Sequence, residues 1–228
     1  MKRLMLALLP ALMLVSACHK QDAVTYTGLE AGTLSSGIFT SDEGVRMTVV
    51  GNEEKYDVTT TRRVLISYET HPVTDSDHID IDIHGLLDAG ILDPVHAQSI
   101  PEDPTGSPLE ITDAWFSKNY LNILASFEGK EPALHDFSAA FTADEKGIVV
   151  RLDHDGSQES YSGSNILSYF LSIPISEPVL SYEQAALAAS IKSPYPAPVI
   201  LQWSARTQTG GPLTLYERKG SYTPPAND

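Results

Sequence analysis

The stretch His78-Ile-Asp-Ile-Asp-Ile-His84 decides the fold class of this chain. Isoleucine alternates there with aspartate or histidine, and a period of two places the isoleucines on one face of a β-strand and the polar side chains on the other. Just upstream, Arg63-Val-Leu-Ile-Ser-Tyr68 is an apolar, partly β-branched run of strand length. Both stretches predict strands, so we expect a β-rich protein with Ile79, Ile81 and Ile83 in its core.

Strand-like segments separated by turn residues continue in both directions. Residues 27–95 have no sustained helical periodicity, which indicates a β-domain. After residue 108, such segments recur roughly every ten residues, as in β-sandwiches of the immunoglobulin type. They are residues 109–116, 120–127, 134–142, 148–152, 166–173, 198–206 and 213–218, with hairpin tips at Lys118-Asn119, Glu145-Lys146-Gly147 and Gly210-Gly211.

A proline-rich segment between these two regions marks a domain boundary. Residues 94–108 contain Pro94, Pro101, Pro104, Pro108 and Gly106. The predicted division is therefore a β-domain at 27–95, a linker at 96–109, a β-sandwich domain at 110–222 and a tail at 223–228.

One segment departs from the β pattern. Ser181-Tyr-Glu-Gln184 precedes an alanine-rich run and resembles a capping box, so it predicts a short helix from Ser181 to Ile191. We interpret this helix as a crossover that covers one end of the sandwich, with a binding role as the alternative.

The N-terminus has the features of a bacterial lipoprotein leader. Met1-Lys2-Arg3 precedes the apolar run 4–15, which is shorter than the ~20 residues of a membrane-spanning helix. The run ends in Leu14-Val-Ser-Ala-Cys18, and Cys18 is the only cysteine of the chain. We predict a signal peptide at 1–17, a lipidated Cys18 and a polar tether at 18–26. The mature chain would then have no disulfide bond.

The chain is strongly acidic. Its formal net charge is −15, and removal of the leader takes away Lys2 and Arg3 but no acid, which leaves −17. Such a surface repels nucleic acid and anionic lipid headgroups. We therefore expect no nucleic-acid partner, and expect membrane attachment through the acyl chains of Cys18.

The residues of the opening stretch also form the first candidate site. His78 and His84 lie on one strand face with two aspartates, at about 6.6 Å between neighbouring positions. Paired histidines on a strand can bind zinc, but four side chains in a straight row cannot converge on one ion without help from another strand. The simpler interpretation is the solvent face of a strand, so His78 and His84 are candidate metal ligands only, and no cofactor is predicted.

Two other segments have a functional and a structural interpretation. Asp153-His154-Asp155-Gly156 could hold a cation, but it lacks the spacing of a calcium-binding hand and is more simply a turn after a strand. Trp115 and Tyr120 flank a predicted hairpin tip, together with Phe116. They are either core and cross-strand aromatics or an exposed binding platform for sugar or peptide.

The sequence contains no catalytic motif of a common type. It has no G-x-S-x-G elbow, no H-E-x-x-H pair and no phosphate-binding loop. Its one cysteine is assigned to lipidation, and no pair of carboxylates is placed for glycoside hydrolysis. We predict that the protein is not an enzyme.

Two segments resemble the NigD-like lipoproteins. Arg63 to Tyr68 is similar to that family's basic, valine-rich strand that ends in tyrosine. Ile111-Thr-Asp-Ala-Trp-Phe-Ser-Lys-Asn-Tyr-Leu-Asn-Ile123 is similar to its Trp, turn, Asn-Tyr-Leu-Asn pattern. Together with the leader, the resemblance extends over essentially the whole mature chain.

The resemblance implies a fold and a function class. The fold is an all-β chain, with an OB-like five-stranded barrel at the N-terminal side followed by an immunoglobulin-like β-sandwich. The family defines no catalytic residues and is linked to bacteriocin immunity. The implied protein is a non-enzymatic envelope lipoprotein that binds a protein partner, in the outer membrane on its periplasmic face or at the cell surface. The alternative is a carbohydrate- or metal-binding accessory module.

This chain departs from the family pattern at two places. No acidic run follows Cys18, so the sequence does not choose between periplasmic and surface display. The helix predicted at 181–191 resembles an insertion before the final hairpin, and an insertion there would alter the end of the sandwich that a partner meets.

Overall fold

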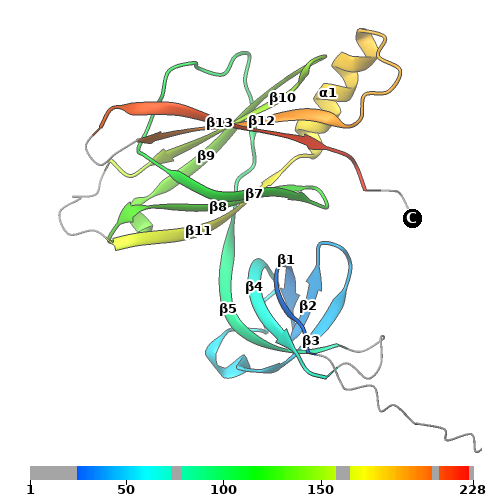
Figure 1. Ribbon diagram of the computed structural model, residues 1–228, viewed down its shortest axis with the longest axis vertical. Coiled ribbons are helices and arrows are strands. Elements are labelled where there is room, and N and C mark those ends of the chain that lie inside the picture. Colours follow the sequence, from blue (N-terminus) through cyan, green and yellow to red (C-terminus); the bar gives the residue numbers. More distant parts are fainter. Residues whose placement is uncertain (1–24, 73–78, 158–164, 207–210, 226–228) are drawn as a thin grey trace, which may run out of the picture.

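The computed structural model describes residues 25–72, 79–157, 165–206 and 211–225 (Figure 1). Most of these residues form strands, which confirms the prediction of an all-β chain. The strands are β1 (Thr27–Ser35), β2 (Ile38–Ser41), β3 (Arg46–Gly51), β4 (Arg62–Thr70), β5 (Asp80–Ile91), β6 (Val95–His96), β7 (Glu110–Ser117), β8 (Tyr120–Gly129), β9 (Asp136–Asp144), β10 (Gly147–Asp155), β11 (Asn165–Pro174), β12 (Ala197–Arg206) and β13 (Leu213–Tyr222). The helix α1 (Ser176–Ala188) and two short 3-10 turns at Glu53–Lys55 and Pro132–Leu134 complete the described elements.

The first five strands pair in a closed circuit, which we call the ring. β1 pairs with β2 and β4, β2 pairs with β3, and β4 pairs with β5. A parallel pairing of β3 with β5 closes the circuit at Thr48 and Val49. Ile81 and Ile83 are fully buried inside the ring, with Ile79 packed beside them, which confirms the alternation predicted for this stretch.

The remaining strands, together with the end of β5, form two layers that pack face to face, which we call the stack. One sheet has the order β5-β11-β8-β7 and the other has the order β13-β12-β10-β9-β6. The largest apolar core lies between them and includes Ile123, Phe141, Val150 and Leu171. The predicted hairpin tips at Lys118-Asn119 and Glu145-Lys146 are confirmed as the turns between β7 and β8 and between β9 and β10.

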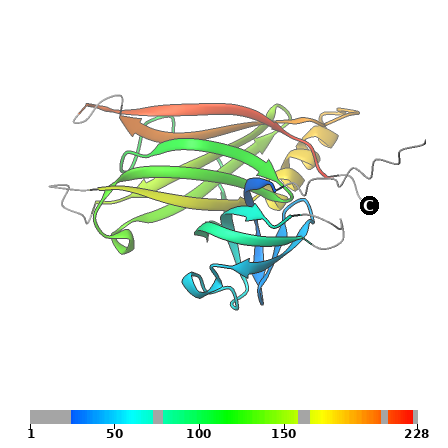
Figure 2. The same ribbon diagram turned by 60° about the horizontal axis from the view of Figure 1, so that its bottom comes forward.

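Strand β5 belongs to both the ring and the stack. Its first part pairs with β4, and its end pairs in parallel with β11, with Ala89 opposite Phe170. One eight-stranded sheet therefore runs through the molecule from ring to stack, as Figures 1 and 2 show. The proline-rich segment that follows β5 lies along the stack, where Leu109 is buried and His96 pairs with β9.

The helix begins earlier than the sequence suggested. Ser181 was predicted to open it through a capping box, whereas α1 begins at Ser176, and its N-cap residue Ile175 makes no side-chain capping bond. Pro178 falls in the first turn, where a missing N–H costs nothing, and Glu177 there complements the helix dipole. Packing of the buried Tyr182 and of α1 against β9 and β10 therefore decides the helix start more than the cap does.

Several predictions concern residues outside the described ranges. The signal peptide at 1–17, Cys18, most of the tether, His78, Gly210 and the last three residues belong to this group. Within the described ranges, no helix is long and apolar enough to cross a membrane.

Candidate functional site

Of the two candidate metal ligands, only His84 lies within the described ranges, and it contacts Glu69 and Tyr56. Its Nε2 lies 3.5 Å from the Glu69 carboxylate, and its backbone carbonyl accepts a hydrogen bond from the Tyr56 hydroxyl. On the same strand, Asp82 lies 2.8 Å from the His71 imidazole. Across the described parts of the chain, no three histidine, cysteine or acidic side chains are grouped as metal ligands. Asp82 and His84 therefore pair with side chains from the neighbouring segment of chain, His71 and Glu69.

Trp115 and Tyr120, the candidate aromatic platform, lie on the outer face of the sheet that contains β7, β8 and β11. Trp115 is half-buried and stacks on Phe170, with ring centroids 6.0 Å apart. The ring of Tyr120 lies under the guanidinium group of Arg63, 3.9 Å from its centroid, in a cation–π contact. Because Arg63 belongs to β4, both aromatic side chains are placed where the ring meets the stack.

This contact between ring and stack, which we call the joint, has an apolar part. Alternation along β11 directs Leu171 and Ile173 into the core of the stack and Phe170 to the opposite face. Phe170 is nevertheless only 1% exposed, because strands of the ring cover it. The apolar residues of the joint are Ala31, Leu65, Ala89, Trp115, Leu124 and Phe170.

The joint also has a buried polar centre. The guanidinium group of Arg63 donates to both carboxylate oxygens of Asp42, at 2.7 Å each. It also donates to Ser172 at 2.8 Å and to Asn122 at 2.9 Å, and Ser117 donates to Asp42. The side chains of Arg63 and Asp42 are each 6% exposed. A bidentate pair with this many partners holds the ring in one orientation on the stack.

Exposed apolar side chains continue the outer sheet face beyond the joint. Leu29 lies two residues before buried Ala31, Leu87 lies two residues before Ala89, and Ile166 lies four residues before Phe170, so each shares the face of its buried neighbour. Their exposures are 62%, 37% and 68%. We call Leu29, Leu87, Trp115, Leu124 and Ile166 the elbow surface.

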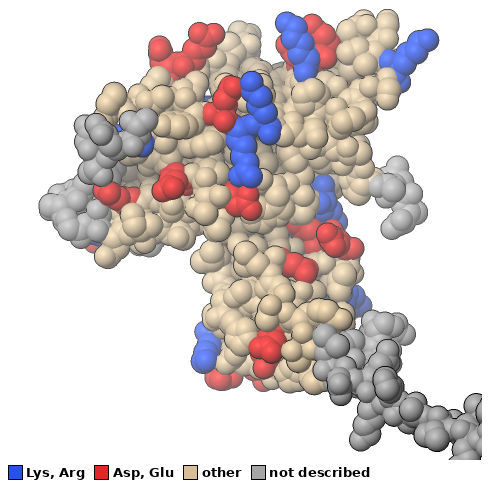
Figure 3. All heavy atoms as spheres, in the orientation of Figure 1, with Lys and Arg blue, Asp and Glu red and all other residues tan. Residues whose placement is uncertain are grey.

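The molecule is bent where the ring meets the stack, and the two parts meet at an angle in the space-filling view (Figure 3). The ring covers only part of the length of β8 and β11, whose far ends project past β5 (Figures 1 and 2). Ile166 lies near the projecting end of β11, opposite Glu128 of β8. The side of the ring and the underside of these strands therefore form an open corner.

The ionisable side chains near the elbow surface are mainly acidic. Alternation places Glu69 on the face of Leu65 and Glu128 on the face of Leu124. Among the basic side chains nearby, Arg63 is already neutralised by Asp42, and His84 lies beside Glu69. Lys130 follows Glu128 by two residues. Figure 3 shows acidic side chains on both the ring and the stack, in keeping with the net charge of −15. The corner is therefore suited to a partner that is both apolar and basic.

A second buried cluster lies at another place in the stack and was not predicted. His154 and His135 are 3% and 6% exposed, and His135 Nδ1 lies 2.9 Å from His154 Nε2. The prediction of a turn at Asp153–Gly156 is wrong for its first three residues, because β10 extends to Asp155 and pairs there with β9. The opposing strand brings Phe137 beside His154, and their rings stack 4.8 Å apart.

The hydrogen bonds of this cluster define its protonation. His154 Nδ1 lies 3.3 Å from the carbonyl oxygen of Pro108, so it carries the hydrogen and donates. Its Nε2 is then the acceptor for His135 Nδ1–H. Burial lowers the pKa of the His154 imidazole below its usual 6.5, and repulsion from His135 acts in the same direction. The His154 imidazole is therefore neutral in the folded protein near pH 7.

We expect acid to destabilise the fold through the buried His154 imidazole. Because the folded pKa of His154 lies below its unfolded value, the unfolded chain takes up a proton first as the pH falls below about 6.5. One such proton removes up to about 1.4 kcal/mol of unfolding free energy per pH unit. Urea unfolding at pH 8, 6.5 and 5 measures this slope. The slope should shrink in the His154→Gln variant, which has no imidazole at this position; an unchanged slope would contradict this assignment.

Known proteins resemble this chain in structure but not detectably in sequence. No protein-family model matches the sequence, and a search of curated proteins finds no match. A NigD-like immunity protein from Bacteroides caccae aligns with a TM-score of 0.61 at 17% identity, over 88% of this chain and 97% of its own. A proposed lipoprotein from Bacteroides fragilis aligns with a TM-score of 0.56 at 13% identity, over 85% and 97%. A protein of unknown function from Bacteroides vulgatus aligns with a TM-score of 0.56 at 14% identity, over 87% and 92%. The sequence resemblance to NigD-like proteins is thus borne out in the fold.

Proposed function

We propose that this chain is a non-enzymatic, lipid-anchored envelope protein that binds a basic polypeptide partner at the elbow surface. The observation that carries the proposal is the continuation of a buried apolar sheet face into the exposed Leu29, Leu87 and Ile166. Exposed apolar side chains that extend a buried apolar face are typical of protein-binding sites. The partner is basic because Glu69 and Glu128 flank the corner and the whole chain is acidic.

The architecture we propose is an OB-like barrel followed by an immunoglobulin-like sandwich. The closed circuit of β1, β2, β3, β5 and β4 supports the barrel. The two facing sheets with one shared core support the sandwich. In this arrangement the joint is an interface between two domains, and such interfaces are frequent places for binding sites.

The proposed anchor would keep the elbow surface close to a membrane. Leu29 lies eleven residues after Cys18, so a fully extended tether places it at most about 40 Å from the lipid. The similar fold of a proposed Bacteroides lipoprotein supports the anchor. Outer-membrane placement is part of the same proposal.

The kind of partner that we propose is a bacteriocin, with immunity as the outcome of binding. The support is the basic, apolar partner that the elbow surface requires, together with the immunity protein among the chains of similar fold. Capture of such a polypeptide near the membrane would keep it from its target.

Expression in a sensitive strain, challenged with a panel of purified cationic bacteriocins, tests this function. The wild-type chain should raise the inhibitory concentration of at least one of them by about tenfold, which corresponds to about 1.4 kcal/mol. The Leu29→Asp/Ile166→Asp variant should lose that protection, because it places charge on the apolar surface.

The matched control adds the same two charges elsewhere. Leu180 and Leu187 on α1 are 53% and 78% exposed and lie outside the elbow surface, so the Leu180→Asp/Leu187→Asp variant should protect as the wild type does. Absence of protection by the wild type would refute immunity, and equal loss in both variants would refute the elbow surface as the site.

A further inference from the structure

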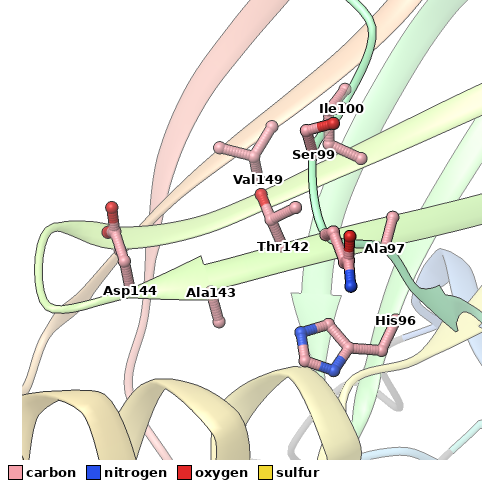
Figure 4. A pocket seen from close by; sticks show the side chains of 10 residues that line it. His96, Ala97, Ser99, Ile100, Thr142, Ala143, Asp144 and Val149 are labelled. Carbon is pink, nitrogen blue, oxygen red and sulfur yellow. The ribbon is translucent and has the colours of Figure 1, made fainter.

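A second, polar cavity lies in the stack, away from the elbow surface. Strand β6 pairs with β9 only at Val95 and His96, and the last bond between them runs from Ala97 N to Phe141 O at 2.8 Å. The chain then diverges, while β9 continues to Asp144. A cavity of about 390 Å³ opens between residues 96–100 and the β9–β10 hairpin (Figure 4). Small-molecule sites have volumes of about 300–1,000 Å³.

The side chains around this cavity offer both hydrogen-bond donors and acceptors. Ser99 lies on one side, Thr142 in the middle and Asp144 at the far end (Figure 4). Gln98 also lines the cavity. Asp144 accepts the Lys146 N–H at 2.8 Å through one carboxylate oxygen, and its other oxygen can accept from a ligand hydroxyl. Val149 and Ile100 supply apolar surface between these groups.

His96 provides a flat surface at the mouth of the cavity. Its ring stacks on Phe141 with centroids 4.8 Å apart and an angle of 12° between the planes. This stacking fixes the orientation of the imidazole, and Phe141 is itself fully buried. A fixed aromatic ring beside hydroxyl and amide groups suits a ligand with one apolar face and several hydroxyls.

Arg151 fixes the chain a few residues beyond the cavity. This side chain is 1% exposed and donates to Thr105 at 2.9 Å, to Ser204 at 3.0 Å and to the carbonyl oxygen of Asp103 at 3.4 Å. These bonds fasten the proline-rich segment that follows residue 100 to the outer face of the second sheet. The cavity is thus formed before any ligand arrives, which reduces the ordering cost of binding.

The lining excludes two classes of ligand. Among the residues that the structure describes, no lysine or arginine lines the cavity, and Asp144 would repel an anion such as a phosphate or a carboxylate. A purely apolar ligand is also unfavourable. It would displace water from the polar side chains of the lining and offer them no hydrogen bond in exchange. We propose that this cavity binds a neutral saccharide unit. Hydroxyls of the sugar bond to Gln98, Ser99, Thr142 and Asp144, and its C–H face lies on His96.

Titration of the purified soluble protein with glucose, galactose, mannose and N-acetylglucosamine, followed by saturation-transfer NMR, tests the proposal. At least one sugar should bind with a dissociation constant of about 1 mM or lower. Ser99 is exposed, so Ser99→Trp fills the cavity without disturbing the core and should weaken binding at least tenfold. Asp144→Asn keeps the turn acceptor and should weaken binding severalfold.

Asp136→Asn is the matched control. Asp136 is exposed on the same strand at its opposite end, so this variant should bind the sugar as the wild type does. Binding of no sugar at concentrations up to about 20 mM, or unchanged binding by Ser99→Trp, would overturn the saccharide site. The Ser99→Trp variant should still protect against bacteriocin. The saccharide site and the elbow surface can therefore be tested independently.

Discussion

Replacement of Arg63 by alanine is expected to lower the free energy of unfolding by about 3–5 kcal/mol, the usual cost of removing one partner of a buried ion pair. The Asp42 carboxylate would remain buried with its bidentate partner gone, and Asn122 and Ser172 would each lose a charged donor. Urea unfolding followed by tryptophan fluorescence measures the change. Trp115 lies in the joint and reports on it directly.

Arg62→Ala is the matched control for this variant. Arg62 precedes Arg63 on β4 and pairs with Asp57 and Asp88, whose side chains are 52% and 65% exposed. Exposed pairs of this kind contribute about 0–1 kcal/mol. If Arg63→Ala were no more destabilising than Arg62→Ala, the polar centre of the joint would not hold the ring on the stack.

Phe170→Ala is expected to cost about 3–5 kcal/mol as well, for a different reason. The variant would leave a cavity in the apolar part of the joint and remove the ring on which Trp115 stacks. Although Phe170 lies on the sheet face that points away from the core of the stack, it is 1% exposed. Its burial therefore depends on the position of the ring.

Ile166→Ala, on the same strand and the same face, is the control. Ile166 is 68% exposed, so its truncation should change stability by no more than about 0.5 kcal/mol. Thermal melting of both variants gives the comparison. Similar small effects at the two positions would mean that the ring does not cover Phe170 in solution.

Local patterns predicted the strands but not what covers them. The alternation around Ile81 and Ile83 identified which face of β5 is buried, because that face depends only on the period of the strand. The Lys118-Asn119 tip was also predictable, because asparagine is a frequent turn residue, although the positive φ of 51° falls on Lys118. In contrast, the helix start at Ser176 depends on packing against β9 and β10 and carries no cap signal.

The sequence identified two residues of the candidate site but not their partners. Trp115 and Tyr120 stood out as aromatics near a hairpin, but the choice between platform and packing depends on Arg63 and Phe170, which lie about fifty residues away in either direction. The His135–His154 pair was hidden for the same reason, since the register of β9 with β10 brings the two residues together. Exposed Leu29 and Ile166 gave no signal at all, because strand periodicity places them on the same face as buried residues.

Binding of a basic polypeptide at the elbow surface is the central proposal for this protein. The most direct measurement is site-specific photo-crosslinking in bacteriocin-treated sensitive cells that express the chain, with the photoreactive side chain at Ile166 in one strain and at Leu187 in another. We expect an adduct between the chain and the bacteriocin from position 166 and none from position 187. Equal adducts at the two positions, or none at position 166, would contradict the account.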